Sequence, residues 1–157
     1  MIPSRVWVAG LALLAGSGCE RTQSAPSPTA LLELRLVCPG ARPDCERHDY
    51  RADSVVFLER EALLSDSDLL DVRPSMAASG DLVLAVRFPP EAGERLSARL
   101  RDNLGGHLAV VIESRVRDVV LIASPVGAHG QLTINSGLAG AEAERLRTRF
   151  LGKWPRR

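Results

Sequence analysis

The sequence predicts an α+β fold in which a mixed or antiparallel sheet carries two amphipathic helices on one face. Short apolar segments separated by glycine, proline and serine indicate several strands. Two longer segments, residues 90–104 and 140–151, instead repeat large apolar residues at helical spacing. The chain has 157 residues, a usual length for one domain.

Alternating or continuous apolar residues mark the predicted strands. Leu32, Leu34 and Leu36 alternate with charged residues, which indicates a half-buried strand. Residues 78–80 separate two apolar segments and predict a hairpin. Residues 107–112 are apolar without alternation, which is typical of a central strand. The predicted strands are residues 31–37, 54–60, 69–77, 81–88, 107–112, 116–122 and 132–134.

Both predicted helices have an apolar face. The first follows two prolines, and proline suits the first turn of a helix. Its predicted buried stripe consists of Leu96, Leu100 and Leu104. Gly105 is placed to end this helix in a left-handed conformation. In the second helix, Leu146 and Phe150 lie one turn apart.

The first 18 residues have the composition of a signal peptide. Arg5 precedes the apolar residues 6–15 and the small residues 16–18, and Cys19 comes next. The apolar part is shorter than the roughly 20 residues that a membrane-spanning helix needs. The pattern resembles the lipobox of bacterial lipoproteins, in which this cysteine is lipidated. An ordinary secretory signal with a chance cysteine is the alternative, and both export the chain from the cytoplasm.

We therefore predict four parts. Residues 1–18 are a lipoprotein signal peptide, and residues 19–30 are the lipidated Cys19 with a flexible linker rich in serine, proline and threonine. Residues 31–152 form the domain, and residues 153–157 are a basic tail.

Cys38 and Cys45 enclose a loop that contains two prolines and a glycine. In an oxidising compartment this arrangement favours a disulfide over a metal-binding pair. A metal site would need further ligands. His48 and Asp49 are near in sequence, but their spacing matches no standard site. The sequence therefore predicts a disulfide and no metal.

Charge and motifs argue against two classes of function. The formal net charge is +1, which gives no general electrostatic reason to expect nucleic-acid binding. The sequence has no Gly-x-Ser-x-Gly elbow, no His-Glu-x-x-His motif and no phosphate-binding glycine loop. We therefore predict no catalytic residues and no cofactor. An enzyme would have to use Ser114, His107 or His129, which the sequence does not pair.

Several segments carry a resemblance to a known family. They are residues 32–37 (LELRLV), 62–69 (ALLSDSDL), 101–112 (RDNLGGHLAVVI), 130–134 (GQLTI) and 142–144 (EAE). In this order they resemble the head subdomain of the first periplasmic domain of SecD, an accessory subunit of the bacterial Sec translocase. The sequence departs from the family at Glu113 and Ser114, where the family has an Asp-Gly turn, and in the loop between the two cysteines. Asn103 and Gly105 are interpreted as structural residues.

The resemblance implies a binding surface. SecD has transmembrane helices with a proton pathway, which this sequence lacks, so we expect no proton-coupled motor of its own. The expected partner is a polypeptide or an envelope protein, including Sec translocon components, bound at a groove or at the sheet edges of residues 31–37 and 69–77. A structural or regulatory lipoprotein that reuses the fold is the alternative.

The expected location is the cell envelope. We expect the lipid-anchored chain to face the periplasm, with the outer membrane favoured over the inner membrane.

Overall fold

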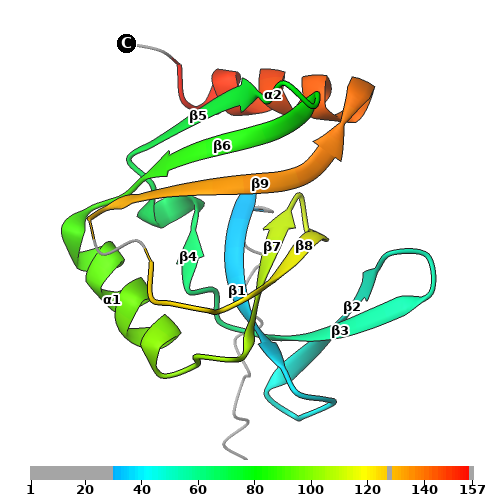
Figure 1. Cartoon of the computed structure of the whole chain (residues 1–157), viewed down its shortest axis with the longest axis vertical. Helices are drawn as coiled ribbons and strands as arrows, with labels where there is room; N and C mark the ends of the chain where they lie inside the picture. The colour runs from blue at the N-terminus through cyan, green and yellow to red at the C-terminus, as the bar shows by residue number, and fades with distance from the viewer. Residues whose placement is uncertain (1–29, 127–128, 156–157) are drawn as a thin grey trace, which may run out of the picture.

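The structure, a computed structural model, describes residues 30–126 and 129–155 (Figure 1). Its strands and two α-helices confirm the predicted α+β class. The strands form two separate sheets, and every strand pairing in them is antiparallel. None of the helices in this part of the chain is long and apolar enough to cross a membrane. The predicted signal peptide and Cys19 lie outside the described residues.

The larger sheet has the order β2-β3-β1-β7-β8, with β4 also paired to β1. Its strands are β1 (Leu32–Cys38), β2 (Cys45–Tyr50), β3 (Ser54–Glu59), β4 (Leu64–Ser65), β7 (His107–Ile112) and β8 (Arg115–Leu121). β1 pairs with β7 along one edge and with β3 and β4 along the other. The expectation that residues 31–37 offer a free sheet edge is therefore wrong.

The smaller sheet has the order β5-β6-β9. Its strands are β5 (Asp71–Met76), β6 (Asp81–Arg87) and β9 (Gln131–Ala139). The predicted hairpin of residues 69–88 is confirmed as β5 and β6. β5 is an end strand of this sheet, as expected for residues 69–77. Helix α2 (Gly140–Lys153) follows β9 directly and packs along this sheet (Figure 1).

Both sheets place one apolar face in a common core. Along β1 and β6 every second side chain enters it, and these side chains are Leu32, Leu34, Leu36, Leu82, Leu84 and Val86. The helices complete this core with Leu96, Leu100, Leu146 and Phe150. Helix α1 (Pro90–Arg101) ends before Leu104, which lies in the following turn and is 52% exposed. The prediction that Leu104 belongs to the buried stripe of this helix is wrong, because the chain leaves the helix before Leu104 and turns towards β7.

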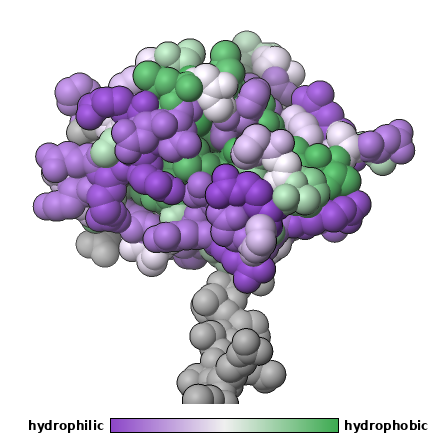
Figure 2. Space-filling model, turned by 90° about the horizontal axis from the view of Figure 1, so that it is seen from below, coloured by the Kyte–Doolittle hydropathy of each residue, from purple (hydrophilic) through white to green (hydrophobic). Residues whose placement is uncertain are grey.

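The opposite face of the larger sheet has a second, smaller core. Leu58 of β3 packs there against Ala109 and Val111 of β7. The sheet curls enough for its two end strands, β2 and β8, to contact each other without being hydrogen-bonded neighbours. On the face shown in Figure 2, hydrophilic side chains predominate and hydrophobic ones form smaller areas between them.

One carboxylate joins the start of β1 to the end of α2. Asp66, in the short 3-10 helix η1 (Asp66–Asp68), accepts hydrogen bonds from the backbone N–H groups of Leu31 at 2.6 Å and Leu32 at 2.9 Å. It also forms an ion pair with Lys153. The two backbone N–H groups and the Lys153 side chain are all distant from Asp66 in the sequence, and all three are held by its carboxylate.

Replacing this carboxylate should destabilise the domain. We expect Asp66→Ala to lower the free energy of unfolding by about 1–3 kcal/mol, because two backbone donors lose their acceptor. Urea unfolding followed by circular dichroism measures the change. The control is Asp53→Ala, at an exposed position between β2 and β3, which should shift the free energy by less than about 0.5 kcal/mol. Equal losses in the two variants would contradict this role of Asp66.

Candidate functional site

Two sheet edges lie side by side in this fold. β8 ends the larger sheet and β9 ends the smaller one, and the two strands are close in space without pairing (Figure 1). They approach each other closely at Gly137, where an added Cβ would lie 3.4 Å from the carbonyl oxygen of Arg117. Further along, a groove of about 240 Å³ lies between the strands. We call this the β8–β9 groove.

The β8–β9 groove is predominantly apolar. Its inner wall includes the core side chains Leu34, Leu100, Leu108, Val110 and Ile134. Around its mouth, Val120 is 40%, Leu121 60% and Val126 38% exposed. Apolar side chains of this size are usually buried, so three exposed ones beside an apolar cavity indicate a surface suited to binding.

Two polar side chains of the groove are engaged locally. The carboxylate of Asp118 accepts a hydrogen bond from the backbone N–H of Val119 at 2.9 Å. The side-chain oxygen of Asn135 accepts one from the N–H of Gly137 at 3.1 Å. These bonds fix the strand backbones and do not form a nucleophile–base pair. The chemistry that the groove offers is therefore apolar contact together with main-chain pairing at strand edges.

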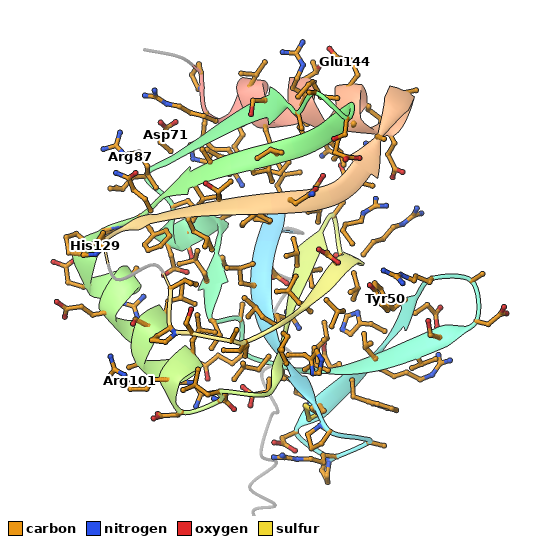
Figure 3. All side chains as sticks on the ribbon, viewed as in Figure 1. Tyr50, Asp71, Arg87, Arg101, His129 and Glu144 are labelled. Atoms are coloured by element: carbon orange, nitrogen blue, oxygen red, sulfur yellow. A yellow bond between two sulfur atoms is a disulfide. The ribbon has the colours of Figure 1, made fainter. Side chains whose placement is uncertain are left out.

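The three residues considered for an enzyme are not assembled into a site. His107 begins β7 and Ser114 follows its other end, so the strand separates them by about 20 Å at the usual rise per residue. His129 is exposed in the loop before β9, at the end of the molecule near α1 and β6 (Figure 3). In the part of the chain that the structure describes, no group of three or more His, Cys, Asp or Glu side chains could hold a metal.

Cys38 and Cys45 are joined by a disulfide with an S–S distance of 2.05 Å. It links the last residue of β1 to the first residue of β2. In the enclosed loop, Arg42 donates hydrogen bonds to Asp44 at 2.6 and 3.1 Å, and these lower the pKa of the Asp44 carboxyl. The disulfide holds β2 next to the rest of the curled sheet and takes no part in the β8–β9 groove.

A similar local pair occurs on α2. Arg147 donates hydrogen bonds to Glu144, one turn earlier, and lowers the pKa of that carboxyl. Glu144 is exposed and Arg147 is half-buried, and the pair contributes only to the surface of the helix.

Sequence reasoning found the strand that forms the groove but not the groove itself. Residues 116–122 were predicted as an apolar strand, and this strand is β8. Its apolar residues continue to Leu121 although the strand is an edge with exposed side chains. The continuous apolar pattern of residues 119–122 was the available signal. It could not separate a buried strand from an exposed binding edge.

Comparisons with known proteins agree with the resemblance seen in the sequence. Residues 44–149, more than half of the chain, match the family described as SecDF, P1 head subdomain. These residues include β8, β9 and therefore both edges of the groove. No curated protein sequence matches the chain.

Two solved SecDF structures are similar to this fold. One is SecDF in its super-membrane-facing form, with 25% sequence identity and a TM-score of 0.55 over 76% of this chain and 19% of that chain. The other is a membrane component SecDF that enhances protein export, with 24% identity and a TM-score of 0.53 over 76% of this chain and 63% of that one. This chain thus corresponds to about a fifth of the first and less than two thirds of the second.

The chain has an α+β fold that is similar to SecDF structures. The match to the family extends from the disulfide loop into α2. This chain belongs to the SecDF P1 head subdomain family.

Proposed function

We propose that the chain is a lipid-anchored periplasmic binding module that holds an extended, apolar polypeptide segment in the β8–β9 groove. The observation that carries this proposal is the apolar groove between two strand edges that do not pair with each other. A membrane component SecDF, similar in fold, enhances protein export. We therefore place the bound polypeptide among exported chains, and the partners among components of the Sec translocon.

The binding would combine two interactions. Unpaired N–H and C=O groups along an edge strand pair with the backbone of an extended peptide, whatever its sequence. Apolar side chains of the peptide then enter the groove, and burying one Val or Leu side chain contributes about 1.5–3 kcal/mol. The groove is smaller than the roughly 300–1,000 Å³ of most small-molecule pockets. It therefore suits one or two side chains of a longer chain.

This activity is binding alone, without a proton-coupled motor or a catalytic step. Reversible contact with a few apolar side chains would hold an unfolded segment near the membrane while it emerges. Residues 19–30 would let the domain reach such segments from a lipidated Cys19, with the outer membrane as the favoured location.

A charge at the mouth of the groove should weaken this binding. We expect Leu121→Asp to weaken binding of a labelled, extended apolar peptide by about tenfold or more, a loss of roughly 1.4 kcal/mol, because burying a carboxylate is unfavourable. Fluorescence anisotropy measures the affinity. A photo-crosslinker at position 121 should also capture exported chains in intact cell envelopes.

The matched control is Leu70→Asp. Leu70 is 59% exposed, almost the same as Leu121, but lies beside β5 at the other edge of the smaller sheet. This variant should bind the peptide normally. Loss of binding in Leu70→Asp with retention in Leu121→Asp would instead place the peptide at the β5 edge. If position 121 crosslinks only to an envelope protein that has no role in export, the alternative function, a structural or regulatory lipoprotein, would be favoured over peptide binding.

The lipid anchor has a separate test. Cells grown with labelled palmitate should incorporate the label into the wild-type protein and not into Cys19→Ala, because lipidation requires the thiol at this position. The double variant Cys38→Ala, Cys45→Ala is the control and should still be labelled. Label that persists in Cys19→Ala would exclude Cys19 as the lipidated residue.

A further inference from the structure

A second hollow lies between the end strands of the curled larger sheet, β2 and β8. It has a volume of about 500 Å³ and shares no residue with the β8–β9 groove. Its lining is basic and consists of Arg47, His48, Asp49, Arg51, Ser114, Arg115, Val116 and Arg117. Four arginines thus line this space together with one acidic residue, Asp49. We call this the arginine hollow.

The arginines of the hollow are only partly neutralised. Arg47 is 3.3 Å from Asp49, in a pair that is mostly exposed. Arg117 forms an ion pair with Glu142 of α2 at 2.7 Å. Arg51 lies over the ring of Tyr50 at 4.9 Å. Among the described residues, neither Arg51 nor Arg115 has an ion-pair partner.

Two glutamates near the hollow are already paired elsewhere. Glu46 is 3.3 Å from Arg35. Glu113, in the turn beside Ser114, binds Arg145 at 2.8 Å and also Arg149. These acidic groups are therefore not free to balance the charge of Arg51 and Arg115. Clustered guanidinium groups repel one another, and a bound anion relieves that repulsion.

Two buried nitrogen atoms give an independent indication. Nε2 of His48 and Nε of Arg117 are both buried and have no hydrogen-bond partner in the described part of the chain. Both residues line the arginine hollow. The nearest carboxylate oxygen to His48 Nε2, on Glu46, is 3.8 Å away, which is too long for a hydrogen bond. Nε of Arg117 always carries a hydrogen, and a buried donor without an acceptor is unfavourable, so an acceptor belongs beside this atom.

We propose that the arginine hollow binds a phosphate-type oxyanion. Guanidinium groups present paired N–H donors that match the oxygen spacing of phosphate, and they bind it more specifically than an ammonium group does. Arg51 and Arg115 supply the free positive charge, and Arg117 Nε supplies a buried donor. The anion is either free phosphate or the phosphate of a phospholipid headgroup. This site does not depend on the proposed peptide groove.

The position of Tyr50 is consistent with a built site. Figure 3 places Tyr50 between the β2–β3 hairpin and β8, where its ring supports Arg51 and packs against the smaller core. The disulfide at the start of β2 restrains the same strand. Arg51 follows Tyr50 directly, in the turn between β2 and β3.

The test uses the full chain in a nonionic detergent and two soluble probes. These are inorganic phosphate and glycerophosphoglycerol, the deacylated headgroup of phosphatidylglycerol. Isothermal titration calorimetry should give a dissociation constant of about 1 mM or tighter for at least one probe. Tighter binding of glycerophosphoglycerol would assign the site to a lipid headgroup, and tighter binding of phosphate to the free anion. Dissociation constants weaker than about 1 mM for both probes would overturn the proposal.

Arg115→Gln should weaken binding roughly tenfold or more, since it removes charge-assisted hydrogen bonds from an arginine that has no structural ion pair. Arg51→Gln should act in the same direction. The matched control is Arg101→Gln, at an exposed position on α1 that lies far from Tyr50 in Figure 3. Unfolding midpoints should be alike for the three variants. Equal weakening in Arg101→Gln and Arg115→Gln would show only a general effect of charge and would overturn the site.

Discussion

The packing of two sheets through one apolar face each is the constraint on which the other features depend. Leu34 of β1 and Leu84 of β6 have no exposed surface in the common core. The two sheets share this core, and their end strands β8 and β9 lie close together. The strands come close at Gly137, and the groove between them reaches down to Leu34 itself. The candidate peptide site is therefore a consequence of how the core is built.

The curl of the larger sheet has a comparable consequence on its other face. Leu58 packs on Ala109 and Val111, and the disulfide holds β2 to the end of β1. These contacts bring β2 to β8 and enclose the arginine hollow. One strand thus borders two sites with different chemistry. The first part of β8 faces the basic hollow, and its last part, with Leu121, faces the apolar groove.

The elements with a strong local pattern could be predicted from the sequence. The hairpin of β5 and β6, both α-helices and the apolar strands β7 and β8 follow from periodicity and turn residues. β2 could not be predicted, because its sequence CERHDY is polar and it becomes a strand by pairing with β3. β9 is longer than expected because the hydroxyl of Ser136 donates to the carbonyl oxygen of Leu82, which satisfies a polar residue inside the core.

The sequence by itself determined the fold class, the family and the residues that can form a disulfide, since these depend on local pattern and spacing. Only the tertiary structure decided which edges are free. It closed both edges of β1 and left β8 and β9 unpaired with each other, and it gathered Arg51 and Arg115 around one hollow. Edge pairing and charge clustering are long-range properties: residues far apart in the sequence create them, so local periodicity carries no information about them.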